Sequence, residues 1–90
     1  MSAFAEIGRR VRSAREDAGL TQEDVANDAG LNSSYYGKLE RGLNNPTIDT
    51  LIRVAGAVGI DPGTLLAGLT PTSLPSREPR ARRGPRRTTA

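Results

Sequence analysis

The strongest constraint on this chain is an apolar repeat of helical spacing that glycines interrupt at short intervals. The first stripe, in steps of three and four residues, consists of Phe4, Ile7, Val11, Ala14 and Ala18. The glycines that follow successive apolar stretches, as glycines at helix ends do, are Gly19, Gly30, Gly42 and Gly59. No segment alternates with a period of two over enough residues to make a strand. The pattern therefore predicts an all-α chain of short helices.

Capping residues locate the second and third helices. Thr21 with Asp24 three positions later resembles a capping box and predicts a helix over residues 22–29. Asn32 is a favourable N-cap, and it predicts a third helix that runs to about Arg41. Only a short turn separates these two helices.

The same kind of signal locates two further helices. Thr47 predicts the N-cap of a helix over residues 48–58, and Asp61 followed by Pro62 predicts the start of a short fifth helix. The leucines of that last helix are Leu65, Leu66 and Leu69. Five helices joined by short turns indicate a compact five-helix bundle.

Charge divides the chain into two unequal parts. Residues 1–69 carry seven basic and nine acidic side chains, whereas residues 70–90 carry six arginines and one glutamate. The second part also contains four of the six prolines and one large apolar residue, so burial cannot offset the entropy lost on ordering. We predict a folded domain over 1–69 and a disordered Arg/Pro-rich basic tail over 70–90. The tail is either a cationic arm that binds nucleic acid through counterion release or an extension with an arginine-biased composition.

The chain lacks the residues of several common active sites. It contains no cysteine and no histidine, which excludes disulfides, a cysteine nucleophile, a Ser-His-Asp triad and a metal site built on His or Cys. The carboxylates are scattered, and no glycine-rich phosphate loop is present. We therefore predict that the chain is not an enzyme and uses no cofactor or metal. Without a signal-peptide pattern or a long apolar run, it is expected in the cytoplasm and not in a membrane.

The junction of the second and third helices is the most informative segment. A tight turn containing Gly30 joins them, and the small Ala26 allows their close crossing, as in a helix-turn-helix. The motif residues are Leu20, Thr21, Gln22, Ala26, Gly30, Leu39, Glu40, Arg41, Gly42, Pro46, Leu65 and Leu66. On these residues, the segment 19–60 resembles the phage-repressor (Cro/XRE) family of helix-turn-helix proteins. The resemblance implies the lambda-repressor-like DNA-binding fold, in which the second and third helices form the helix-turn-helix.

Tyr36 departs from the pattern of this family, which usually has an aliphatic residue at that position. A tyrosine there must either bury its ring and find a partner for its hydroxyl, or tilt outward. The packing angle of the third helix depends on which alternative holds.

The third helix is predicted to present a small, polar and cationic face. Helical geometry turns Tyr36 and Leu39 inward. The residues on the opposite side are Ser33, Ser34, Gly37, Lys38 and Arg41. Such a face fits the major groove of DNA, where a lysine can bind guanine O6 and N7. The resemblance implies that the base-reading residues are Asn32, Ser33, Ser34 and Lys38, and an ordinary solvated helix face is the alternative.

Further residues are predicted to contact the DNA backbone. In the resembling proteins, the position of Gln22 binds a phosphate and braces the start of the third helix, and Asn44 and Asn45 fall in a loop along the sugar-phosphate backbone. Arg41 is a further predicted phosphate contact, and Tyr35 either donates its hydroxyl to a phosphate or lies over the edge of the core. The alternatives are structural, because glutamine suits a first helical turn and asparagines suit a loop turn.

The remaining charged side chains of the first and third helices have their own interpretations. Arg15 and Glu40 would each be partly buried, and the resemblance implies that they form an ion pair between the first and third helices. Three arginines lie on the polar side of the first helix: Arg9, Arg10 and Arg12. Either Arg10 or Arg9 touches phosphate, or the whole face is solvated and balanced by the carboxylates of Glu6, Glu16 and Asp17.

These features predict a sequence-specific, double-stranded DNA-binding transcriptional regulator, either repressor-like or controller-like. Its third helix is expected to read the major groove, and the protein is expected to associate with the nucleoid. A short helix covers few base pairs, so we expect a homodimer on a pseudo-palindrome, with Leu65, Leu66 and Leu69 in the dimer contact. The alternative is a protein-interaction module of the same fold, either an antitoxin bound to a toxin or a coactivator bound to the transcription machinery.

Overall fold

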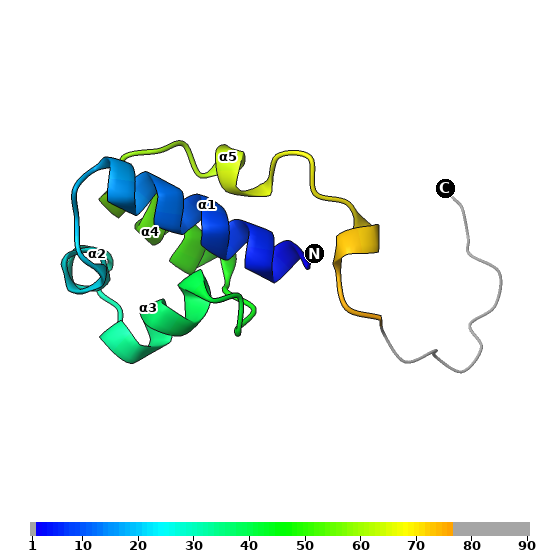
Figure 1. Cartoon of the computed structure of the whole chain (residues 1–90), viewed down its shortest axis with the longest axis horizontal. Helices are drawn as coiled ribbons and strands as arrows, with labels where there is room; N and C mark the ends of the chain where they lie inside the picture. Colours follow the sequence, from blue (N-terminus) through cyan, green and yellow to red (C-terminus); the bar gives the residue numbers. More distant parts are fainter. Residues whose placement is uncertain (1, 77–90) are drawn as a thin grey trace, which may run out of the picture.

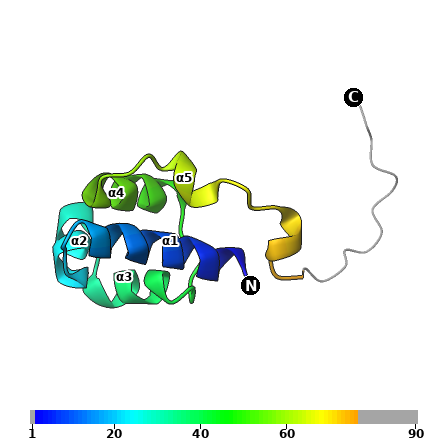
Figure 2. The same ribbon diagram turned by 45° about the horizontal axis from the view of Figure 1, so that its top comes forward.

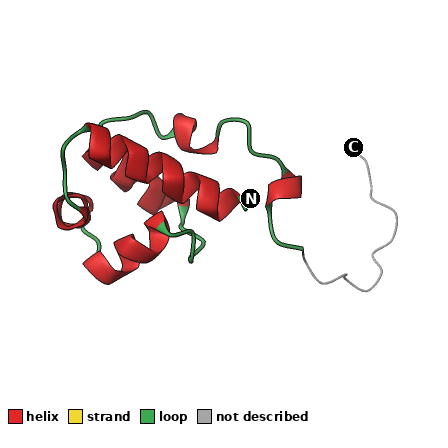
Figure 3. Cartoon of the chain, in the orientation of Figure 1, coloured by secondary structure: helices red, strands yellow, loops and turns green. Residues whose placement is uncertain are grey.

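Five helices make up most of residues 2–76, the part of the chain that the computed structural model describes (Figure 1). They are α1 (Ala3–Asp17), α2 (Gln22–Ala29), α3 (Ser33–Glu40), α4 (Ile48–Val58) and α5 (Gly63–Leu66), followed by the single-turn 3-10 helix η1 (Pro71–Ser73). Figure 3 shows helices and loops, and no strand, in this part of the chain. The prediction of an all-α five-helix bundle is confirmed. No helix within residues 2–76 is long and apolar enough to cross a membrane.

Polar side chains begin the second, third and fourth helices at the predicted positions. Thr21 and Asp24 form a complete capping box, with hydrogen bonds of 3.0 Å from Asp24 N to Thr21 Oγ1 and 2.9 Å from Thr21 N to Asp24 Oδ2. These hydrogen bonds with Thr21 hold the pKa of Asp24 below its usual value. Asn32 and Thr47 accept backbone hydrogen bonds at the starts of α3 and α4. The predicted N-caps of α2, α3 and α4 are therefore confirmed.

A single apolar core joins all five helices. α1 lies between α3 and α5 and packs against both, as Figures 1 and 2 show, and α2 packs on α3 and α4. The largest fully buried side chains are Tyr36, Leu39, Leu65, Val11, Val25 and Val54. Because α3 contributes two of these side chains, the core determines which face of α3 reaches solvent.

Two glycines bring the backbones of α1 and α3 into contact. A Cβ atom on Gly8 would overlap the carbonyl oxygens of Leu39 and Glu40. Gly42, directly after α3, has a φ of +73°, and a Cβ atom there would lie 2.6 Å from Cα of Ala5. Gly42 was predicted to end the third helix, but the role of Gly8 was not predicted. The C-terminal half of α3 is thus held directly against α1.

The fifth helix differs from its prediction at both ends. α5 ends at Leu66, so Leu69 lies after the helix and not on it. The chain leaves the helix at Ala67, whose ψ is 129°, and Ala67 and Gly68 form a turn closed by a hydrogen bond of 3.1 Å from Leu69 N to the carbonyl oxygen of Leu66. At the start of α5, Pro62 is the N-cap position and not the first helical residue, so the predicted N-cap at Asp61 lies one residue too early. Oδ1 of Asp61 still accepts a hydrogen bond of 3.0 Å from Gly63 N.

Arg10 joins α5 to α1. Its Nη1 donates to the carbonyl oxygens of Thr64 at 3.0 Å and Ala67 at 2.8 Å, and its Nε donates to Glu6 at 2.7 Å. Hydrogen bonds from Arg9 and Arg10 lower the pKa of Glu6 to about 2. The predicted balance of the α1 arginines by Glu6 and Glu16 is confirmed by the ion pairs of Arg9, Arg10 and Arg12. The link from the Arg10 guanidinium to α5 was not predicted.

The described chain continues past the predicted domain boundary at Leu69. η1 lies within the segment that was assigned to the tail, and it was not predicted. Leu74, which follows η1, is half exposed. The rest of the predicted tail, residues 77–90, lies outside the described residues, so the disordered tail and the domain boundary stay predictions.

Candidate nucleic-acid interface

A three-residue connection joins α2 to α3. Gly30 adopts the left-handed conformation, with a φ of 72°, and ends α2. The next residue, Leu31, donates from its backbone N to the carbonyl oxygen of Ala26 at 2.8 Å, and Asn32 then caps α3. Val25 and Ala26 are buried beneath the junction. The two helices therefore have the tight turn and the small crossing residue of a helix-turn-helix.

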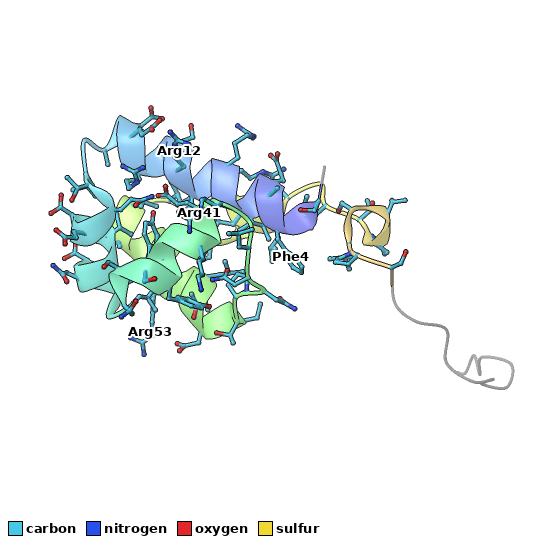
Figure 4. The ribbon with its side chains drawn as sticks, turned by 60° about the horizontal axis from the view of Figure 1, so that its bottom comes forward. Phe4, Arg12, Arg41 and Arg53 are labelled. Atoms are coloured by element: carbon cyan, nitrogen blue, oxygen red, sulfur yellow. The ribbon has the colours of Figure 1, made fainter. Side chains whose placement is uncertain are left out.

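α3 presents one polar face to solvent. Its exposed side chains, together with that of the C-cap residue, are Ser33, Ser34, Lys38 and Arg41. Tyr36 and Leu39 point into the core, as predicted. The one carboxylate of α3, on Glu40, is also turned inward. The exposed face of residues 33–41 therefore carries positive charge and no negative charge, and Figure 4 shows Arg41 at the end of α3.

The neighbouring helix has the opposite charge. The exposed acidic side chains of α2 are Glu23, Asp24 and Asp28. A polyanion would be repelled by α2 and attracted by α3, so the charge distribution favours α3 as the contact helix.

The structure changes the roles of two residues on the predicted face. Asn32 uses its Oδ1 as the cap, accepting hydrogen bonds from Ser34 N at 2.8 Å and Tyr35 N at 3.1 Å, so only its Nδ2 is outside the cap. Gly37 was predicted to face outward, and this is wrong. It is buried, because the side chains of Arg41 and Gln22 cover it.

Gln22 lies at the first position of α2, as predicted, but it braces a different part of α3. Its Nε2 donates a hydrogen bond of 2.9 Å to Oε1 of Glu40, the last residue of α3. The resemblance implied a brace at the start of that helix. This bond uses one of the two amide N–H groups of Gln22, and its predicted phosphate contact stays a prediction.

Glu40 is the centre of a buried polar network. Arg15 donates to it from Nε at 2.6 Å and from Nη2 at 3.1 Å, which brings the predicted ion pair together. Tyr36 donates its hydroxyl to Oε2 of Glu40 at 2.5 Å, so the ring is buried and the hydroxyl has a partner. Burial raises the pKa of Glu40, but hydrogen bonds from Arg15, Tyr36 and Gln22 outweigh it and hold that pKa below its usual value. Burial and the bond to Glu40 raise the pKa of Tyr36.

The loop after α3 is attached to that helix through Asn44. Its Nδ2 donates to the carbonyl oxygen of Tyr35 at 3.3 Å, and its Oδ1 is buried without a hydrogen-bond partner among the described residues. Asn45 is exposed, and the Tyr35 side chain is half-buried at the flank of α3. Asn44 therefore attaches the loop to α3, a role that was not predicted, and the phosphate contacts of Asn44 and Asn45 stay predictions.

The three leucines predicted to form a dimer contact lie in different environments. Leu65 is fully buried in the core of its own chain, so it cannot contact a second copy, and the prediction is wrong for this residue. Leu66 is 43% exposed and Leu69 is half-buried. Both line an apolar groove of about 390 Å³, which Phe4 and Leu74 also line. Figure 4 shows Phe4 at this end of the bundle.

Comparisons with known proteins agree with this geometry. A family described as helix-turn-helix matches residues 11–65. The immunity repressor protein of Bacillus phage phi105 is 43% identical over 54 residues, which are 60% of this chain and 38% of the repressor. The chain therefore matches well under half the length of that relative.

Two solved structures share the fold of the bundle. The restriction-modification controller protein C.AhdI from Aeromonas hydrophila has a TM-score of 0.67 and 37% identity, covering 69% of this chain and 94% of the controller. SinR, a master regulator for biofilm formation solved in complex with DNA, has a TM-score of 0.64 and 34% identity, covering 67% of this chain and 97% of the SinR chain.

Proposed function

The chain belongs to the phage-repressor (Cro/XRE) family of helix-turn-helix proteins, and on that premise we propose that it is a sequence-specific, double-stranded DNA-binding transcriptional regulator. The observation that carries the proposal is the exposed face of α3, which combines short polar side chains with two cations while its one carboxylate is buried and paired. SinR, a structural neighbour, was solved in complex with DNA, which supports the same partner here.

Each exposed residue of α3 has a chemical role in this proposal. The serines are short enough to let the helix backbone approach the base edges, and Lys38 is long enough to reach guanine O6 and N7 in the major groove. Asn32 contributes its remaining Nδ2 donor at the start of the helix. Gln22 and Arg41, whose side chains both lie close to Gly37, bind phosphates and orient α3 in the groove.

The proposal includes a homodimer. α3 is eight residues long, so one copy spans too few base pairs for a selective site, and two copies one helical turn apart would read a pseudo-palindrome. Leu66 and Leu69 are the leucines left for the dimer contact, and the groove beside them supplies further apolar surface. The six arginines of residues 77–90 add sequence-independent affinity for phosphates.

The experiment that tests this function is selection of binding sites from a random double-stranded DNA library with the full chain. We expect a pseudo-palindromic consensus. The Lys38→Ala variant should lose selectivity at one base position, whereas Arg53→Ala removes an equal charge from α4 and should leave the consensus unchanged. Binding to all duplexes without a preferred sequence would refute the proposal and favour the protein-interaction alternative, in which the arginines alone bind nucleic acid.

A further inference from the structure

Tyr36 contains a hydroxyl that the core does not require. Its ring is fully buried among apolar side chains, in a position where the family pattern usually has an aliphatic residue. A buried hydroxyl is unfavourable without a partner, and the partner here is Glu40, four residues later on the same helix. The tyrosine is therefore linked to the polar network and not only to the core.

The hydroxyl completes the coordination of the Glu40 carboxylate. Oε2 accepts hydrogen bonds from Arg15 Nε and the Tyr36 hydroxyl, and Oε1 accepts from Arg15 Nη2 and Gln22 Nε2. A carboxylate has about four lone-pair sites, so these donors fill all of them. The Glu40 side chain is 2% exposed, so water cannot replace a donor that is lost. Four donors from three helices fix the plane of the carboxylate.

We infer that Tyr36 is a positioning residue for DNA binding, which acts through Glu40 on the amide of Gln22. The inference rests on the proposed function, in which Gln22 binds a phosphate with its second N–H. Without the hydroxyl, Oε2 keeps only its bond from Arg15, and a carboxylate held by three donors instead of four holds the bond from Gln22 Nε2 in a less defined orientation. The Gln22 side chain then has to become ordered when DNA binds, and this loss of conformational entropy weakens its phosphate contact.

A double-mutant cycle on the selected DNA site tests the inference. Tyr36→Phe keeps the ring and removes only the hydroxyl, and it should weaken binding by about 2- to 12-fold, the net effect of one hydrogen bond. In a Gln22→Ala background, the same substitution should have almost no further effect, because the side chain that it positions is absent. Effects that multiply, or a Tyr36→Phe variant that binds like the wild type, would overturn the inference.

A stability control separates positioning from folding. Val58→Ala removes buried apolar volume at the last residue of α4 and leaves all four donors to Glu40 in place. It should leave the affinity of the folded protein unchanged. If Val58→Ala weakens binding as much as Tyr36→Phe does, the effect of Tyr36 is only structural.

A second readout does not depend on DNA. Gln22 is the single glutamine of the chain, so NMR relaxation of its side-chain NH₂ group can be followed in the free protein. The group should be ordered in the wild type and more mobile in Tyr36→Phe, and equal mobility would contradict the inference. A wild-type chain that selects no DNA sequence would refute the proposed function instead, and that result is obtained before any variant is compared.

Discussion

Replacement of Arg15 by methionine would leave the Glu40 carboxylate buried without its charge partner. The side chains are 13% and 2% exposed, so water cannot replace the two hydrogen bonds that Arg15 donates. Breaking a buried pair from one side costs about 3–5 kcal/mol. A fold of 75 residues has a total stability of about 4–11 kcal/mol. We therefore expect Arg15→Met to lose at least about a quarter of its free energy of unfolding, measured by urea denaturation and circular dichroism at pH 7.

The loss of unfolding free energy in Arg15→Met should become smaller as the pH falls. In the wild type the pKa of Glu40 is lowered in the folded state, so ionised Glu40 contributes stability above the unfolded value of 4.5, and this is lost as the pH falls through the folded value. In Arg15→Met, burial without the arginine raises that pKa, and the folded variant takes up a proton more readily than the unfolded chain. The difference in stability between wild type and variant should narrow between pH 7 and pH 4.

A second substitution separates charge from packing. Adding Glu40→Met to Arg15→Met removes the uncompensated carboxylate and should recover most of the loss. The recovery should be incomplete, because the Tyr36 hydroxyl is left buried without an acceptor, at about 1–3 kcal/mol. Arg12→Met is the control, since its ion pair with Glu16 is exposed and its loss should barely change stability. A double variant no more stable than Arg15→Met alone would refute this reasoning.

Three further outcomes are expected. Lys38→Ala should reduce the binding free energy for the selected DNA site by about 1–3 kcal/mol in fluorescence anisotropy titrations. A variant with wild-type affinity would show that α3 does not bind the major groove through Lys38. Deleting residues 77–90 should make the slope of log K against log salt shallower by about 0.9 per lost phosphate contact while the ranking of DNA sequences survives. A changed ranking would mean that the arginines read a groove. Leu66→Glu should convert a dimer to a monomer in sedimentation experiments and weaken binding, and an unchanged dimer would place the contact elsewhere.

The helix boundaries could be predicted because their causes are local. Each of three N-cap side chains accepts a hydrogen bond from a backbone N–H group no more than three residues later: Thr21, Asn32 and Thr47. Both partners of each of these hydrogen bonds can therefore be seen in one short stretch of sequence. The Arg15–Glu40 pair could be predicted from the resemblance, since two charges near apolar stripes need each other.

The end of the bundle could not be predicted, because its contacts are distant in sequence. α5 is a single turn. Arg10 on α1, more than fifty residues earlier in the chain, donates hydrogen bonds to the carbonyl oxygens of Thr64 and Ala67. The orientation set by this attachment decides which leucine enters the core. Three leucines close together in sequence indicate that the segment is apolar, but the burial of Leu65 and the exposure of Leu66 depend on how α5 crosses α1.

Tyr36 shows that the number of hydrogen bonds a buried carboxylate can accept is a better guide to its partners than one predicted ion pair. The sequence places Tyr36 and Glu40 four residues apart on one predicted helix, a spacing that brings side chains together, and Arg15 was predicted to pair with the same carboxylate. Taken together, these two inferences favour the buried ring, because a carboxylate held inside by an arginine still has lone pairs for a hydroxyl. The donor from Gln22 could not be added in this way, since its bond to Glu40 depends on the crossing of α2 and α3, which the packing of the whole bundle sets.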